Sequence, residues 1–292
     1  MYLVFDIGGT TVKYAYMDEF ALIYERGTFV TQKESAEAFY QSIQNVKNQY
    51  NDVKGVALSY PGLVDASLGK AINSLALKPL NDRYITKELT DLIGVPVSLE
   101  NDAKCAALAE LWLGSLKGVN DALVMVLGTG IGGAVIINGD IYKGKHFKAG
   151  EFGSFISEFD DESLESLSLG ATHSAVKLVE RIADRLNIGH DGKKVFEYIE
   201  NRNEIAYPMF KKYCNQLAKV IFNIDYVLDL DRVAIGGGIS AQPIVIETLN
   251  ESFKELRRRY RDDIYDLEIV ACHYYNDANL IGALYHHLKG VK

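Results

Sequence analysis

Residues 1–17, Met-Tyr-Leu-Val-Phe-Asp-Ile-Gly-Gly-Thr-Thr-Val-Lys-Tyr-Ala-Tyr-Met, contain the pattern that decides the fold. Two β-prone apolar runs, Tyr2–Phe5 and Val12–Met17, lie on either side of a glycine turn. Apolar residues then recur at helical spacing over residues 39–50, and Val53–Leu58 returns to a strand pattern. This order of strand, glycine turn, strand, helix and strand is typical of an α/β lobe.

The second half of the chain begins in the same way. Ala122–Leu127 has the pattern of a buried strand, residues 128–133 form a glycine turn, and Ala134–Ile137 has the pattern of a second strand. We therefore predict an α/β protein with two similar lobes that face a cleft. The smaller lobe comprises residues 1–113 with a C-terminal segment, 273–292, whose helix packs back on it, and the larger lobe comprises residues 114–272.

Composition favours small-molecule chemistry. The chain has 292 residues with 39 acidic and 31 basic side chains, a net charge of −8, which disfavours binding to a nucleic-acid backbone. No run of about 18 uncharged apolar residues could span a membrane, and no basic segment precedes the first apolar run, so we expect a cytoplasmic protein. Three widely separated cysteines, Cys105, Cys214 and Cys272, indicate buried thiols rather than a disulfide framework.

Three glycine-rich turns each follow an apolar strand, at Asp6–Thr11, Gly128–Gly133 and Gly236–Gly238. Glycine lets backbone amides approach a phosphate without a Cβ in the way, and threonine hydroxyls add donors. Any one of these turns is equally explained as a tight hairpin without a ligand. Three turns in this position favour a bound nucleotide.

Other phosphate-binding motifs match only in part. Residues 128–133 fit G-x-G-x-x-G, but a strand follows where the dinucleotide fingerprint needs a helix, and the chain lacks the other protein-kinase motifs. Residues 139–145 fit G-x-x-x-x-G-K, but His146 replaces the required serine or threonine and no helix follows. We interpret both matches as coincidental.

Six motifs in order resemble those of one family. They are Asp6-Ile7-Gly8-Gly9-Thr10 with Lys13, Pro61-Gly62-Leu63-Val64-Asp65 with Asn73 after it, Glu100-Asn101-Asp102-Ala103, residues 128–133, Ala149-Gly150-Glu151-Phe152-Gly153, and Gly236-Gly237-Gly238-Ile239. The chain resembles the sugar kinases of the ROK (repressor, open reading frame, kinase) family in the actin-like ATPase superfamily. The resemblance implies two actin-like, ribonuclease H-like lobes and a hexokinase-type reaction with ATP and Mg²⁺.

The resemblance also implies roles for individual residues. ATP would be bound by Asp6, Gly8, Gly9, Thr10, Thr11, Lys13, Gly128, Thr129, Gly130, Gly132, Gly237 and Gly238. The sugar would be bound by Gly62, Asn73, Asn101, Asp102, Glu151, Ser154 and Glu165. Asp102 would be the general base, although an aspartate before a helix also serves as an N-cap. Asp6 would hold Mg²⁺ through water, although it could simply form a turn.

One departure from the family concerns zinc. The family usually has a histidine that binds sugar and zinc where this chain has Ser154, and a cysteine cluster follows. Residues 155–163 contain no cysteine, and a hydroxyl is a poor zinc ligand. We predict that the protein has no zinc site. Whether this change lowers activity or alters specificity is left open.

Two other functions compete with glucokinase-like phosphorylation of a hexose or hexose derivative. The first is a sugar-responsive repressor, which would carry a winged-helix domain before the core, whereas here the first strand starts at Tyr2. The second is a sugar-binding member with weak or no kinase activity. The sequence does not decide whether the sugar is glucose, N-acetylmannosamine, fructose or a β-glucoside. It also does not decide whether the protein forms a homodimer. His286 and His287 are assigned to the exposed end of the last helix.

Overall fold

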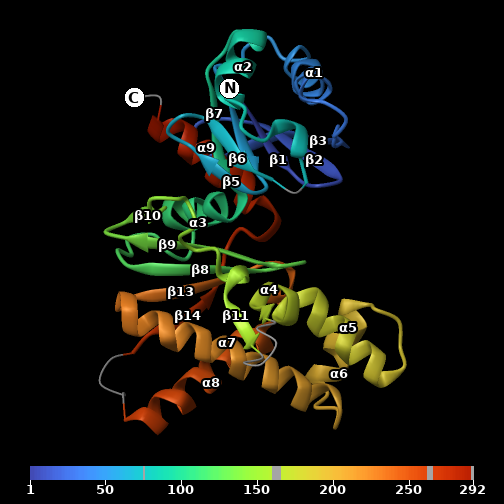
Figure 1. The fold of residues 1–292 in the computed structure, drawn as a ribbon, viewed down its shortest axis with the longest axis vertical. Helices are drawn as coiled ribbons and strands as arrows, with labels where there is room; N and C mark the ends of the chain where they lie inside the picture. Colours follow the sequence, from blue (N-terminus) through green and yellow to red (C-terminus); the bar gives the residue numbers. More distant parts are fainter. Residues whose placement is uncertain (75, 160–165, 262–265, 291–292) are drawn as a thin grey trace. The chain divides into compact units, whose positions relative to one another are not determined.

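The computed structural model describes residues 1–74, 76–159, 166–261 and 266–290, which form two compact units (Figure 1). Unit 1 comprises Met1–Gly114, Lys143–Lys148 and Asn276–Lys292, and unit 2 comprises Ser115–Tyr142 and Ala149–Tyr275. Each unit contains a mixed five-stranded sheet. The predicted α/β class is therefore confirmed.

The sheet of unit 1 combines a meander with three parallel strands. Its order is β3 (Ile23–Val30), β2 (Thr11–Met17), β1 (Tyr2–Ile7), β4 (Gly55–Tyr60) and β7 (Val97–Asn101). Strands β1, β4 and β7 are parallel, whereas β2 and β3 are antiparallel to their neighbours. A small hairpin, β5 (Leu63–Asp65) and β6 (Lys70–Asn73), follows β4, and a 3-10 turn, η1 (Lys78–Leu80), follows the hairpin.

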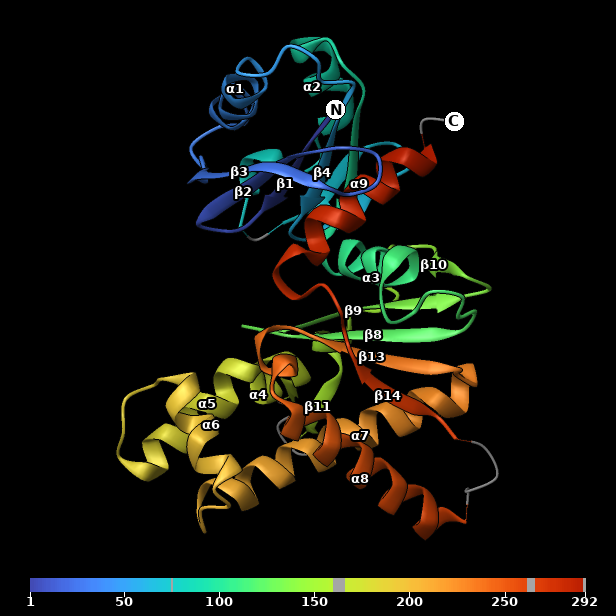
Figure 2. The ribbon, with the colours of Figure 1, turned by 180° about the vertical axis from the view of Figure 1, so that it is seen from behind.

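The two faces of this sheet differ in character. Leu3, Phe5 and Ile7 alternate along β1 and form an apolar core with α1 (Ala36–Lys47) and α2 (Ile85–Ile93). The opposite face carries smaller and more polar residues and packs against α9 (Ala278–Gly290). Figure 2, the view from the side opposite to Figure 1, shows α9 beside this sheet. The sheet therefore has one apolar face and one face on which polar side chains meet a helix.

Helix α9 also packs closely against α3 (Asp102–Leu113). A Cβ placed on Gly282 would lie 1.7 Å from the carbonyl oxygen of Cys105, so the two helix backbones approach each other where only glycine fits. The rings of Trp112 and Tyr285 stack with centroids 5.0 Å apart near the end of α3. The last helix thus fixes both the sheet and the helix that begins at Asp102.

Unit 2 repeats the strand, glycine turn and strand of unit 1. Its sheet order is β10 (Asp140–Tyr142), β9 (Ile131–Ile137), β8 (Ala122–Leu127), β13 (Arg232–Gly236) and β14 (Glu268–Ala271). The remaining elements are the hairpin β11 (Ile156–Phe159) and β12 (Ser166–Ser168), the helices α4 (Leu169–His173), α5 (Ala175–Leu186), α6 (Gly192–Glu200), α7 (Ala206–Leu228) and α8 (Pro243–Tyr260), and the 3-10 turns η2 (Phe152–Ser154), η3 (Gly238–Ala241) and η4 (Tyr275–Asp277).

Burial of the cysteines agrees with the sequence prediction. Cys105, Cys214 and Cys272 are all free thiols and all buried. Burial raises the pKa of the Cys105 thiol well above its ordinary value. Within the described parts of the chain, no helix combines the length and the apolar character needed to cross a membrane.

The prediction that His286 and His287 lie at an exposed helix end is wrong. His287 is 1% exposed, and its Nδ1 lies 3.0 Å from the hydroxyl oxygen of Ser98. A Cβ on Gly55 would lie 2.2 Å from Nε2 of His287, so this glycine makes room for the imidazole. His286 is largely buried and faces Glu100. The error arises because α9 packs against the sheet near its C-terminal end as well.

The burial of His287 predicts how stability depends on pH. Burial, together with the charge of His286, lowers its pKa from 6.5 to about 4. The folded protein binds a proton on His287 more weakly than the unfolded chain does. The contribution of His287 to the free energy of unfolding is therefore complete above pH 6.5 and is lost as the pH falls toward 4. We expect denaturant titrations to show a smaller loss of stability over this interval for His287→Gln than for wild type. The control is His190→Gln at an exposed histidine, and equal pH slopes for wild type and His287→Gln would contradict the prediction.

Candidate active site

Polar side chains form one row across the sheet of unit 1. Strand register places Thr28, Lys13, Asp6, Ser59 and Glu100 opposite one another on successive strands. The hydroxyl of Ser59 donates to Oδ1 of Asp6 at 3.1 Å, which shows that the two side chains share a face. Carboxyl ends of parallel strands meet at one edge of a sheet, where ligand sites of α/β proteins commonly lie.

Asp6 is held by two donors on one oxygen. Its Oδ1 accepts hydrogen bonds from Ser59 and, at 2.9 Å, from Nδ2 of Asn279 on α9. No residue that the structure describes donates to its other oxygen, Oδ2. A carboxylate oxygen is the ligand type that Mg²⁺ prefers, and Mg²⁺ usually keeps several waters. Asp6 therefore fits the predicted metal role.

The first glycine turn is closed by backbone hydrogen bonds. The amide of Gly8 donates to the carbonyl of Thr11 at 3.1 Å, and a Cβ on Gly8 would lie 2.7 Å from that oxygen. The hydroxyl of Thr31 donates to the carbonyl of Gly8 at 2.8 Å. Thr10 and Thr11 are exposed beside Gly9, and Lys13 is exposed on β2. The turn thus gathers the predicted ATP-binding residues of unit 1.

The alternative that Asp102 is the N-cap of α3 is wrong, because Asn101 has that role. The side-chain oxygen of Asn101 accepts the amide of Lys104 at 3.1 Å, whereas Asp102 is the first helical residue. Oδ1 of Asp102 accepts from Nδ2 of Asn101 at 3.0 Å and from the amide of Ala103 at 2.8 Å. Asp102 is therefore oriented by its neighbours without serving as the cap.

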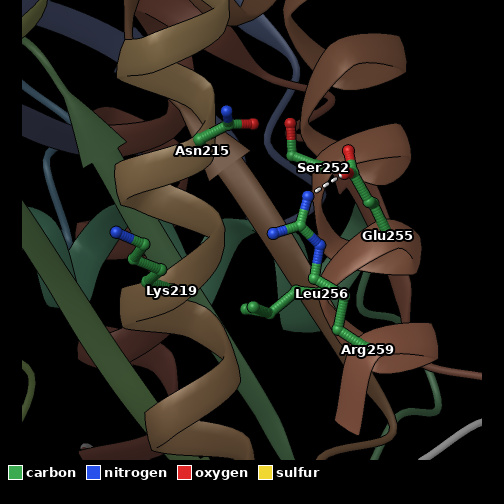
Figure 3. Close-up of a pocket in the computed structure, with 6 residues that line it drawn as sticks. All are labelled: Asn215, Lys219, Ser252, Glu255, Leu256 and Arg259. Atoms are coloured by element: carbon green, nitrogen blue, oxygen red, sulfur yellow. Dashed lines mark hydrogen bonds and ion pairs between the residues drawn. The ribbon is translucent and has the colours of Figure 1, made fainter. Parts of the chain in front are cut away.

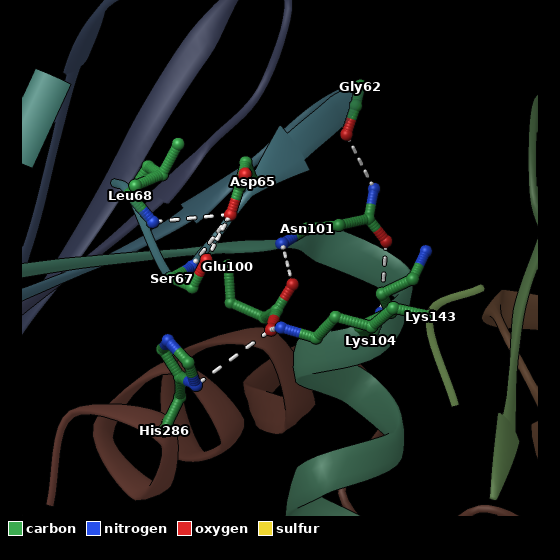
Figure 4. A network of polar contacts seen from close by, with 9 residues as sticks. All are labelled: Gly62, Asp65, Ser67, Leu68, Glu100, Asn101, Lys104, Lys143 and His286. Atoms are coloured by element: carbon green, nitrogen blue, oxygen red, sulfur yellow. Dashed lines mark hydrogen bonds and ion pairs between the residues drawn. The ribbon is translucent and has the colours of Figure 1, made fainter. Parts of the chain in front are cut away.

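The predicted sugar-binding residues of unit 1 lie together. Nδ2 of Asn101 also donates to the carbonyl of Gly62 at 2.9 Å (Figure 4). Gly62 has a φ of +120°, and a Cβ there would lie 2.3 Å from the carbonyl oxygen of Asn73. Nδ2 of Asn81 approaches Oδ1 of Asn73 at 3.4 Å. The structure therefore brings Gly62, Asn73, Asn101 and Asp102 into one cluster.

The second and third glycine turns lie side by side in unit 2. A Cβ on Gly237, which has a φ of +89°, would lie 2.0 Å from the carbonyl oxygen of Leu127 at the end of β8. Among the residues that the structure describes, none has an atom within 4 Å of a Cβ placed on Gly128, Gly130 or Gly238, their chain neighbours aside. Thr129 is exposed, and Gly132 is on β9. These turns leave room for a phosphate to approach backbone amides.

The segment around Glu151 packs on β9. A Cβ on Gly150, with a φ of +84°, would lie 2.8 Å from Cα of Ala134, and one on Gly153 would lie 2.4 Å from the carbonyl oxygen of Ile131. This places Glu151, partly exposed, at the start of η2. Ser154 at the end of η2 is exposed. The predicted sugar-binding residue Glu165 lies outside the described residues.

The lack of a zinc site remains a prediction. Ser154 offers a hydroxyl, and residues 155–159 next to it contain neither cysteine nor histidine. Among the described residues, no group of three or more histidine, cysteine, aspartate or glutamate side chains could hold a metal. We expect metal analysis of the purified, dialysed protein to find less than one zinc per chain. One zinc per chain that survives dialysis would contradict this.

A separate polar pocket lies between α7 and α8 of unit 2 (Figure 3). Glu255 and Arg259 form an ion pair within it, and Ser252 donates its hydroxyl to a carbonyl of its own helix. No predicted site residue lines this pocket. It is therefore not part of the candidate active site.

Three residues that donate hydrogen bonds to carboxylates of the candidate site were not predicted from the sequence. Ser59 and Asn279 bind Asp6, and Lys143 binds Glu100. Ser59 lies near the end of the apolar strand β4, opposite Asp6, and could have been found from the strand register. Asn279 is 273 residues from Asp6 in sequence, and no local pattern indicates that contact.

Two units with this strand, glycine turn and strand, each on a mixed five-stranded sheet, define an α/β protein of the actin-like class. The sequence profile of the ROK family matches residues 2–289, and the chain belongs to this family. The predicted resemblance to ROK family sugar kinases is thereby confirmed.

Individual relatives match over nearly their whole length. The chain is 30% identical to a β-glucoside kinase of Listeria innocua, covering 98% of this chain and 96% of that protein. A ROK family protein of Streptococcus pneumoniae, solved with sucrose, is 29% identical with a TM-score of 0.87, covering 99% of each chain. A glucokinase of Streptomyces griseus, solved with glucose and AMPPNP, is 22% identical with a TM-score of 0.77, covering 97% of each, and shows the fold alone.

Proposed function

We propose that this protein transfers a phosphoryl group from ATP to a hydroxyl group of a hexose or hexose derivative. The observation that carries the proposal is the arrangement at one edge of the unit 1 sheet. There Asp6 lies near the end of β1 beside a glycine turn, Asn101 is the last residue of β7, and Asp102 begins α3 directly after it. A carboxylate for a metal and a carboxylate for a proton thus lie on the same sheet edge, which suits phosphoryl transfer.

Charge on the phosphates must be neutralised for this reaction. The glycine turns at 8–9, 128–130 and 237–238 would supply backbone amides, with Thr10, Thr11, Thr129 and Lys13 as further donors. Mg²⁺, when bound, supplies positive charge at the phosphates. Asp6 would hold that ion through water with Oδ2, because Ser59 and Asn279 already occupy Oδ1.

Asp102 would act on the sugar. As the sugar oxygen forms its bond to phosphorus and the bond to the ADP oxygen breaks, the hydroxyl proton moves to the Asp102 carboxylate. Asn101, Asn73, Glu151, Ser154 and the loop at Gly62 would hydrogen-bond the other hydroxyls, with Glu165 as a further candidate. Such partners give selectivity because a sugar that lacks one leaves a buried polar group unpaired.

The relatives favour a β-glucoside as the specific substrate. Two relatives at 28% and 30% identity are β-glucoside kinases, whereas a glucokinase and N-acetylmannosamine kinases match at 26% and 24%. We infer that a β-linked glucose disaccharide has a higher kcat/KM than free glucose, N-acetylmannosamine or fructose.

The test incubates the purified protein with ATP, Mg²⁺ and each sugar, and identifies products by mass spectrometry. We expect a phosphorylated sugar, with the β-glucoside giving the highest kcat/KM. Preference for free glucose would overturn only the choice of substrate. Sugar binding without any phosphorylated product would overturn phosphoryl transfer and support the sugar-binding alternative.

A further inference from the structure

Glu100 is a buried carboxylate next to the proposed catalytic residues. It is 1% exposed and precedes Asn101 at the end of β7. Its Oε1 accepts the backbone amide of Asn101 at 2.8 Å, and its Oε2 accepts a hydrogen bond from Nζ of Lys143 at 2.5 Å (Figure 4). Nδ1 of His286 lies 3.8 Å from the same oxygen. Both oxygens of the buried carboxylate are therefore engaged.

Lys143 comes from an unexpected part of the chain. It follows β10 and begins the segment Lys143–Lys148, which belongs to unit 1 although the chain on both sides belongs to unit 2. This segment overlaps the coincidental G-x-x-x-x-G-K match. The lysine of that match, Lys145, is exposed, whereas Lys143 is the one that forms an ion pair with Glu100.

A buried carboxylate needs a compensating charge. Removing one member of a buried ion pair leaves the other uncompensated, which is strongly unfavourable. Burial lowers the pKa of His286, and the charge of Lys143 lowers it further, so beside Lys143 the protonated form of this ring is disfavoured. Lys143 is thus the cation that neutralises Glu100 in the contacts that the structure describes.

The contacts of Glu100 lead directly to Asp102. Glu100 fixes the backbone of Asn101, and Nδ2 of Asn101 donates to both Gly62 and Asp102. We propose that Lys143 is a positioning residue for phosphoryl transfer, which neutralises Glu100 and through Asn101 orients the carboxylate of Asp102. This inference rests on the proposed function, and it adds to it a residue that touches neither the sugar nor the nucleotide.

The kinetic test compares Lys143→Met with Lys145→Met on the same segment. Misplacement of a catalytic group by about 1 Å can cost about 100-fold, so we expect kcat of Lys143→Met to fall roughly 10-fold or more. The KM for ATP should change much less, because the phosphate-binding turns are untouched. Lys143→Arg should recover most of the activity, and Lys145→Met should match wild type. Equal kcat values for Lys143→Met and Lys145→Met would overturn the proposal.

Glu100→Gln separates positioning from general destabilisation. Glutamine keeps an oxygen for the Asn101 amide but has no charge that needs neutralising. Lys143→Met should therefore cost much less activity in the Glu100→Gln protein than in wild type. Additive losses from the two substitutions would contradict coupling through Glu100. If Lys143→Met alone fails to fold, the double variant with Lys143→Met and Glu100→Gln is compared with Glu100→Gln. The two should have similar kcat values, and a double variant 10-fold or more below Glu100→Gln would overturn the proposal.

Hydrogen exchange supplies a readout that needs no activity. The hydrogen bond to Glu100 protects the Asn101 amide from exchange in wild type. In the Lys143→Met protein, amide hydrogens of a peptide spanning residues 97–104 should therefore exchange faster, while the exchange rates of β1 and β4 stay unchanged. Unchanged exchange in that peptide would overturn the positioning role. A wild-type protein that phosphorylates no sugar would overturn the proposed function instead, so the two failures can be distinguished.

Discussion

Replacing Asp102 by asparagine should lower kcat by roughly 100-fold or more. Asparagine cannot take up the proton of a sugar hydroxyl at neutral pH, but its carbonyl oxygen can still accept the hydrogen bonds from Asn101 and Ala103. The helix cap is Asn101, so α3 should remain capped. We therefore expect the KM values and the melting temperature to change little, which kinetics and thermal unfolding of one preparation would measure.

The matched control is Asp91→Asn, which removes an exposed carboxylate paired with Lys87 on α2. That variant should keep full activity, and its stability should change by no more than about 0.5 kcal/mol. An Asp102→Asn protein that retains more than about a tenth of wild-type kcat would contradict the assignment of the base. A large loss of stability with normal kcat would show that Asp102 is structural.

Replacing Gly282 by alanine should lower the free energy of unfolding more than any of the other substitutions proposed. The new Cβ would lie 1.7 Å from the carbonyl oxygen of Cys105, so α9 and α3 must move apart. Overpacking a tight contact costs about 1–3 kcal/mol, and a backbone oxygen cannot rotate away, so we expect about 3 kcal/mol. Activity should fall as well, because α9 carries Asn279 and α3 begins at Asp102.

Gly290→Ala is the control on the same helix. Among the described residues, no atom outside the adjoining helix backbone lies within 4 Å of a Cβ at that position, so alanine should leave stability unchanged or raise it slightly through its higher helix propensity. Denaturant titration of both variants measures the difference in the free energy of unfolding. A Gly282→Ala protein as stable as Gly290→Ala would show that the helices are not in close contact there.

The sequence predicted the parts of the fold that local pattern encodes. Apolar runs around glycine turns predicted β1, β2, β8 and β9, and the helical spacing over residues 39–50 predicted α1. The edge strand β3 was missed because Tyr24, Glu25 and Arg26 are all exposed, so no apolar alternation marks it. The hairpin β5–β6 was missed because each of its strands is too short for a periodic signal.

The candidate site was predictable only where its residues form motifs. The glycine turns follow strands directly, and Glu100-Asn101-Asp102 spans the end of β7 and the start of α3, so their place in the pattern marks them. The residues that orient them come from distant segments, since Asn279 lies on α9 and Lys143 lies after β10. Such contacts depend on how α9 and the segment Lys143–Lys148 pack on the sheet, and that packing leaves no short-range trace in the sequence.

The most direct test of the central claim is a coupled assay of ADP release by the wild-type protein with ATP and Mg²⁺. We expect ADP release that depends on an added sugar, saturates with that sugar, and is lost in Asp102→Asn. No sugar-dependent ADP release across glucose, N-acetylmannosamine, fructose and β-glucosides would contradict the claim that this ROK family member is an active sugar kinase.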